Sequence, residues 1–275
     1  MFPLVLQNLT PTIGFPWACR VMGFIQLALL LPANFLVQSR LRPLPDAKAS
    51  IDLAALLEPT FALTTFGVFL IEWGVTVPIA YLTTYAIENG MEEGFAYGLL
   101  PIFNAGSVLG RWFPNYAADK FGRYNVMVIT ILSCATTILG LWLSSGGGGD
   151  KTKNMLIAFA VLYGFGSGSG IGLAPVCVGQ ICRTEDYGKR YGTCYALASF
   201  AWVFPQPGRL HALASHGSLT MLRSLTGVPI AGAILSTYGS YTGLIWFNAA
   251  SYMGAVLMFG VVRLVRAGWG LRTIF

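Results

Sequence analysis

The sequence predicts an all-α membrane protein with about seven transmembrane helices, and three observations support this fold class. Hydrophobic residues make up 55% of the 275 residues and charged residues only 10%, against about 25% charged residues in a typical soluble domain. A surface with so few charges suits lipid rather than water. The other two observations are the length of the apolar runs and the one-sided distribution of basic residues between them.

Seven apolar runs provide the roughly 20 residues that a membrane-spanning helix requires. They occupy residues 17–38, 61–87, 96–118, 126–144, 155–178, 191 to about 236, and 241–264. Polar, turn-rich segments separate them, at residues 39–58, 88–94, 119–124, 145–154, 183–190 and 237–240. The sixth run is broken in its middle, so its two parts must cross the membrane as one span for this count to hold.

Basic residues gather in every second connection along the chain. These connections and the C-terminal tail hold Arg40, Arg42, Lys48, Lys120, Arg123, Arg183, Lys189, Arg190, Arg263, Arg266 and Arg272. The alternate connections hold Glu88, Glu92, Glu93, Lys151 and Lys153. By the positive-inside rule, the first set faces the cytoplasm. Because the bases are scattered between apolar runs, they do not form a nucleic-acid surface, and the lipid bilayer is the expected partner.

Arg111 is the strongest candidate for a functional side chain within the membrane. It precedes Asp119 by eight residues, which places it about 12 Å from the end of its span. An arginine at mid-membrane costs roughly 2.5–3.5 kcal/mol, so its presence requires a reason. We expect Arg111 to bind a small organic anion, with Ser107 and Asn104, four and seven residues earlier, as polar partners on the same helix face. The alternative is a structural arginine that pairs with Asp119 or with helix carbonyls.

Glu72 lies in the middle of the second run. A carboxyl group in hydrocarbon is favoured in its neutral form, so Glu72 is a candidate for coupling a proton or another ion to transport. The alternative is a neutral carboxyl group hydrogen-bonded to a neighbouring helix.

The fifth run is rich in glycine at positions 164, 166, 168, 170 and 172. This pattern lacks the strand, turn and helix of a dinucleotide-binding loop, whereas small residues four apart predict close helix–helix packing. The sequence shows no nucleophile–base–acid set, no metal-ligand cluster and no phosphate loop. We therefore expect neither an enzyme nor a bound cofactor or metal.

Asp119, Gly122 and Arg123 form a short basic loop between the third and fourth runs. A Gly-Arg pair with a preceding aspartate resembles the loop signature of the major facilitator superfamily, and we expect these three residues to latch a gate. Further segments resemble fungal monocarboxylate-transporter-like proteins of that superfamily, at residues 13–20, 72–74, 107–111, 163–165 and 188–193. The resemblance covers nearly the whole chain outside one insert.

The resemblance implies a fold equivalent to helices six to twelve of a twelve-helix carrier with two six-helix halves. Residues 1–58 would form the first span and the cytoplasmic linker between the halves, and residues 59–275 the C-terminal half. Arg111 matches an arginine that binds the substrate carboxylate in animal members. Ser107 stands where those members have a proton-handling aspartate, so proton coupling by that pair is not implied.

The resemblance further implies a transporter that moves a small, monocarboxylate-like solute by alternating access, as a symporter where a proton is coupled. The plasma membrane is the expected location and an internal membrane is the alternative. Because nearly all of a first half is missing, the chain is expected to be an incomplete fragment. The alternatives are a non-transporting membrane interaction protein and a gene-model fragment.

Residues 202–223 interrupt the sixth run and differ in composition from their flanks. They contain both histidines of the chain, His211 and His216, and their removal joins the two parts of the run into one continuous helix. We interpret this insert as a retained intron or a gene-model error. Sequencing of the transcript tests this interpretation, and an abundant message that contains these codons would contradict it.

Overall fold

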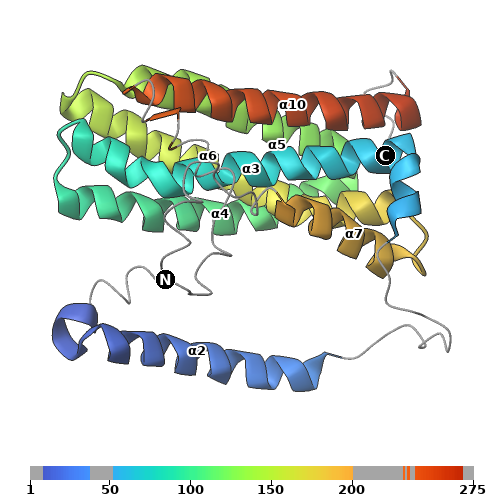
Figure 1. Ribbon diagram of the computed structural model, residues 1–275, viewed down its shortest axis with the longest axis horizontal. Coiled ribbons are helices and arrows are strands. Elements are labelled where there is room, and N and C mark those ends of the chain that lie inside the picture. Colours follow the sequence, from blue (N-terminus) through green and yellow to red (C-terminus); the bar gives the residue numbers. More distant parts are fainter. Residues whose placement is uncertain (1–8, 38–51, 201–231, 233, 236–238, 269–275) are drawn as a thin grey trace, which may run out of the picture. The chain divides into compact units, whose positions relative to one another are not determined.

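The computed structural model describes residues 9–37, 52–200, 232, 234–235 and 239–268, and the elements in these ranges are helices. The chain forms two compact units, residues 1–50 and 51–275, which are described separately. The first unit contains α2 (Phe15–Leu36, blue in Figure 1). Its 22 residues correspond to about 33 Å, enough to cross a hydrocarbon core of about 30 Å.

The second unit is a helical bundle (Figure 1). A short 3₁₀ helix, η1, precedes the long helices, and the fourth predicted run begins as α5 and continues through a π-helical turn and a 3₁₀ turn. The elements are η1 (Leu53–Leu57), α3 (Pro59–Glu88), α4 (Glu93–Phe121), α5 (Arg123–Thr137), η2 (Ile138–Trp142), η3 (Leu143–Ser145), α6 (Gly149–Ile181), α7 (Tyr187–Phe200) and α10 (Tyr241–Ala267).

Five helices in the described ranges are long and apolar enough to cross a membrane, namely α2, α3, α5 with its two extensions, α6 and α10. The predicted third span is α4, whose 29 residues include Asn104, Arg111 and Asp119 and make it less apolar. The predicted sixth span begins as α7, and the insert at 202–223 lies outside the described residues. The predicted all-α membrane fold is therefore confirmed, whereas the proposed boundary between residues 58 and 59 stays a prediction.

Glycine lets α4 and α6 approach each other closely. A Cβ atom on Gly106 would lie 2.6 Å from the carbonyl oxygen of Val161, and one on Gly110 would overlap the backbone of Phe165. On the fifth run, a Cβ atom on Gly164 would overlap the backbone of Phe103, and one on Gly168 that of Ser107. The prediction that the glycines of this run serve helix packing is thus confirmed. We call this contact the glycine seam and define it by Gly106, Gly110, Gly164 and Gly168.

Helix α10 packs against α3 and α5 on another side of the bundle (Figure 1). In the core, the hydroxyl groups of Tyr163 on α6 and Tyr252 on α10 form a hydrogen bond of 2.7 Å. The ring of Tyr252 lies against Gly74, where a Cβ atom would be only 2.6 Å from it. These contacts hold the middle of α3, and with it Glu72, in a fixed relation to α6 and α10.

Candidate functional site

The residues predicted to bind an anion are divided between two environments on α4. Arg111 and Asn104 have exposed side chains on one face of the helix, and the Asn104 amide donates a hydrogen bond of 3.0 Å to the carbonyl of Leu100. Ser107 is buried, and its backbone and hydroxyl oxygen lie against Gly168 in the glycine seam. The structure therefore brings Asn104 and Arg111 to a common face and directs Ser107 towards α6.

Asp119 lies in the last turn of α4, Gly122 connects α4 to α5, and Arg123 begins α5. An oxygen of Asp119 lies 3.9 Å from a guanidinium nitrogen of Arg123, and the side chains are 70% and 41% exposed, respectively. Gly122 has φ of 92°, a conformation that glycine adopts readily and that other residues adopt with strain. Within the described ranges, Asp119 forms an ion pair with Arg123 and none with Arg111.

Glu72 is half-buried on α3. Its carboxyl group is within electrostatic range of the Tyr195 hydroxyl and the Cys194 thiol on α7, and also of the Tyr252 hydroxyl on α10. The structure does not bring Glu72 into contact with Arg111, which lies on α4.

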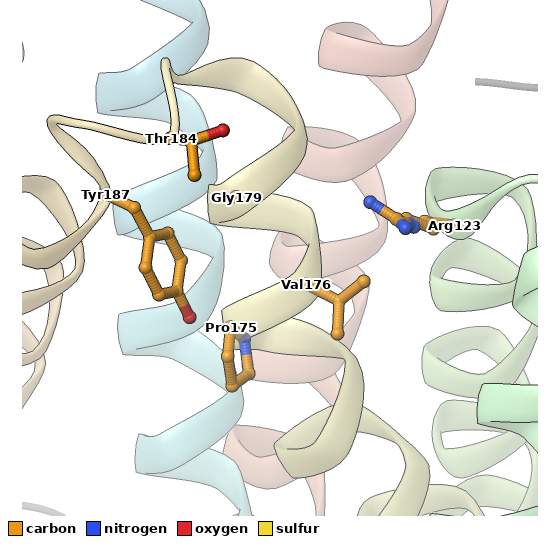
Figure 2. Close-up of a pocket in the computed structure, with 6 residues that line it drawn as sticks. All are labelled: Arg123, Pro175, Val176, Gly179, Thr184 and Tyr187. Carbon is orange, nitrogen blue, oxygen red and sulfur yellow. The ribbon is translucent and has the colours of Figure 1, made fainter. Parts of the chain in front are cut away.

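A shallow pocket of about 230 Å³ opens near the end of the bundle that holds the α4–α5 and α6–α7 turns. We call this end the basic end, because Lys120, Arg123, Arg183, Lys189 and Arg190 lie in these turns or in the helix ends beside them. Figure 2 shows Arg123 on one side of the pocket, Tyr187 on the other, and residues of α6 between them. The lining residues are Arg123, Pro175, Val176, Gly179, Thr184 and Tyr187.

A paired carboxylate and guanidinium connect the start of α3 to the start of α7 at the basic end. The Arg190 guanidinium donates two hydrogen bonds to the Glu58 carboxylate, one of them 2.7 Å long. These hydrogen bonds hold the pKa of Glu58 below its ordinary value of 4.5. Arg190 also lies over the ring of Phe61, 5.6 Å from its centroid. The pair joins residues 132 positions apart, and sequence reasoning did not identify it.

Three tyrosines follow one another along α7 at four-residue spacing. The rings of Tyr187 and Tyr191 stack with centroids 5.6 Å apart, and those of Tyr191 and Tyr195 lie 4.7 Å apart with a tilt of 48°. We call Tyr187, Tyr191 and Tyr195 the tyrosine ladder. It begins at the pocket in Figure 2 and reaches the surroundings of Glu72 about 12 Å further along the helix. The spacing was visible in the sequence, although it was not recognised as a site there.

Comparison with known proteins identifies one matching family. Residues 2–204 match the model described as the Major Facilitator Superfamily. An MFS-type transporter of Penicillium oxalicum is 36% identical over 275 aligned residues, which cover 99% of this chain and 58% of the relative.

Two further relatives have more specific names. The riboflavin transporter of Saccharomyces cerevisiae is 33% identical over 93% of this chain and 49% of its own length. The aspyridones efflux protein of Emericella nidulans is 32% identical over 98% of this chain and 50% of its own length. The chain thus spans about half the length of the curated relatives that it matches.

Proposed function

Because this chain belongs to the Major Facilitator Superfamily and is an integral, multi-pass membrane protein, we propose that it forms one half of a carrier for a small organic solute. The observation that carries the proposal is the match to transporters over nearly the whole chain, combined with its coverage of only about half of each relative. Carriers of this kind bind their solute between two halves and expose it alternately to either side. The second half would come from residues that this sequence does not include or from another polypeptide.

Arg111 supplies the charge for an anionic group of the solute in this proposal. Its side chain is exposed on α4 near Asn104, and a guanidinium can hold a carboxylate through two parallel hydrogen bonds. A monocarboxylate-like solute fits this chemistry. The relatives named for riboflavin and for aspyridones widen the class of solutes to larger organic molecules.

Glu72 is the group that we assign to proton or ion coupling. Its half-buried position in a membrane-spanning helix supports this assignment. The Asp119–Arg123 turn, fixed by Gly122, is assigned to gating at the basic end. The plasma membrane is the proposed location, with the basic end facing the cytoplasm.

Transport by a reassembled carrier tests the proposal. The chain would be expressed in yeast alone and together with the N-terminal half of the Penicillium oxalicum relative, and the flux of labelled monocarboxylates and riboflavin would be measured in vesicles. We expect flux only when both halves are present. Equal flux with the chain alone would refute the one-half proposal, and absence of flux in both cases would refute the transport proposal.

A second candidate function follows from the short coverage of the relatives. A chain that spans about half of a carrier can associate with a complete carrier without moving solute itself. Copurification of the chain with a complete relative, together with absent flux in the reassembly experiment, is the result that this alternative predicts.

A further inference from the structure

We infer that α3 contains a hinge at residues 74–78, that the Tyr163 hydroxyl group of α6 latches this hinge, and that the Asn248 amide of α10 is its second hydrogen-bond partner. The hinge is a feature of the bundle itself, so the inference goes beyond the proposed function and is testable without transport. It begins two residues after Glu72, and a bend there would move the following part of α3 relative to this carboxyl group.

Pro78 lies inside α3 and removes one hydrogen bond from the helix. A proline nitrogen carries no hydrogen, so the carbonyl of Gly74, four residues earlier, loses its usual helical donor. In a membrane segment such a carbonyl must find a donor on a neighbouring side chain or helix, because hydrocarbon offers none. The Thr76 hydroxyl also donates to the carbonyl of Trp73, at 2.8 Å, and side chains bonded to the backbone in this way favour bending. The helix is therefore weakened at residues 74–78.

The Tyr163 hydroxyl group supplies the missing donor from α6. Its oxygen lies 3.4 Å from the Gly74 carbonyl oxygen and 2.7 Å from the Tyr252 hydroxyl oxygen on α10. Both tyrosines are buried, so each hydroxyl proton requires an acceptor within the protein. Donation from Tyr252 to Tyr163, and from Tyr163 to Gly74, satisfies both protons. Because the bond to Gly74 is long, it is weak and can be released at little cost.

Asn248 lies on α10 one turn before Tyr252 and faces the same part of α3. It is fully buried, and its Oδ1 atom would lie 3.1 Å from a Cβ atom on Gly74. Within the described residues, neither polar atom of its amide makes a hydrogen bond of ordinary geometry. A buried amide without a partner is unfavourable, so a shift of α3 that brings the Gly74 carbonyl to the amide Nδ2 group gains there what it loses at Tyr163. The segment thus has two hydrogen-bonded arrangements of similar free energy.

A double-mutant cycle on the full chain in lipid nanodiscs tests the latch, with hydrogen–deuterium exchange of amides 75–82 as the measurement. We expect Tyr163→Phe, which removes only the hydroxyl group, to speed this exchange about tenfold, as the loss of one hydrogen bond implies. In a Pro78→Ala background, which restores the helical N–H group, Tyr163→Phe should change the exchange by less than about twofold. Pro101→Ala, at a proline inside α4, is the matched control and should leave the tenfold effect of Tyr163→Phe in place.

Asn248→Leu tests the second partner. It replaces the unpaired amide by an apolar side chain of similar size, so the melting temperature in detergent should rise by a few degrees and the exchange of amides 75–82 should slow. Pro78→Ala alone should also slow this exchange, which keeps the hinge testable should Tyr163→Phe lose its helical circular dichroism.

Unchanged exchange in Tyr163→Phe, or an equal effect of this variant in both proline backgrounds, would overturn the latch. A lower melting temperature for Asn248→Leu would overturn the second partner. These measurements require no solute, so their failure would leave the proposed function intact, whereas absence of flux in the reassembled carrier would leave the hinge intact.

Discussion

Arg111 and Arg190 differ in how their charges are held. The Arg190 side chain is 15% exposed, donates to Glu58 and covers Phe61. The Arg111 side chain is exposed on α4, and within the described residues it takes part in no ion pair. The charge of Arg190 is therefore neutralised by Glu58 within the protein, whereas the charge of Arg111 is available to bind a ligand.

We predict that Arg111→Gln lowers the flux of an anionic solute through the reassembled carrier by about tenfold or more, because one charge-assisted hydrogen bond contributes roughly 1.5–3 kcal/mol. The side chain is exposed, so folding should be retained. Flux would be measured as a function of solute concentration, with Lys151→Gln at an exposed lysine of α6 as the control. Unchanged flux and affinity would remove Arg111 from the binding site.

We predict that Glu58→Gln lowers the melting temperature of the chain in detergent at pH 7, with a loss of less than about 1 kcal/mol because the Glu58 carboxylate is 45% exposed and solvent screens the pair. The pKa of Glu58 is lower in the folded chain than its ordinary value of 4.5. The stabilisation is therefore complete above the unfolded pKa and is lost as the pH falls through the folded pKa.

The difference in melting temperature between wild type and Glu58→Gln should accordingly shrink as the pH is lowered below 4.5. Glu185→Gln, at an exposed glutamate between α6 and α7, should show little difference at any of these pH values. A Glu58→Gln difference that stays constant down to pH 3 would contradict the assignment of the pair.

At the scale of elements, the glycine seam makes the sharpest prediction. Gly110→Ala introduces a Cβ atom into the backbone of Phe165, so α4 and α6 must separate, and overpacking of this kind costs about 1–3 kcal/mol. Gly98→Ala on the same helix meets no atom within 4 Å and should be neutral or slightly stabilising. Melting temperature in detergent compares the two variants, and equal values would show that the seam tolerates a methyl group.

The length of the apolar runs predicted the helices well, because a membrane span is recognised by its hydrophobicity. Helices α3 and α10 extend only a few residues beyond their predicted runs.

The packing role of Ser107 could not be predicted from the length of the apolar runs. The spacing of Ser107 predicted a position beside Arg111. In the structure, Ser107 packs against Gly168 on α6, because this residue has no Cβ atom to occupy the same space. The Glu58–Arg190 pair was missed because the approach of α7 to α3 depends on tertiary packing between distant segments.

At the scale of the whole molecule, the chain spans about half of the length of its relatives, and in the proposed function its helices line one side of a carrier. The proposed functional groups lie on two helices, with Arg111 on α4 for the solute and Glu72 on α3 for proton or ion coupling. Because Arg111 supplies a positive charge, the reassembled carrier, tested with an organic acid against a neutral solute of similar size, should prefer the acid.

In the proposed transport cycle, the glycine seam also determines which helices can slide past one another. Where backbones touch without intervening side chains, a small axial displacement brings a carbonyl oxygen against the next Cα atom, so the contact resists shear. Helices α4 and α6 should consequently move as one rigid body. The distance between Arg111 on α4 and Tyr163 on α6 should therefore stay constant while the surrounding helices rearrange. A pair of spin labels on these two helices would report a constant separation throughout turnover.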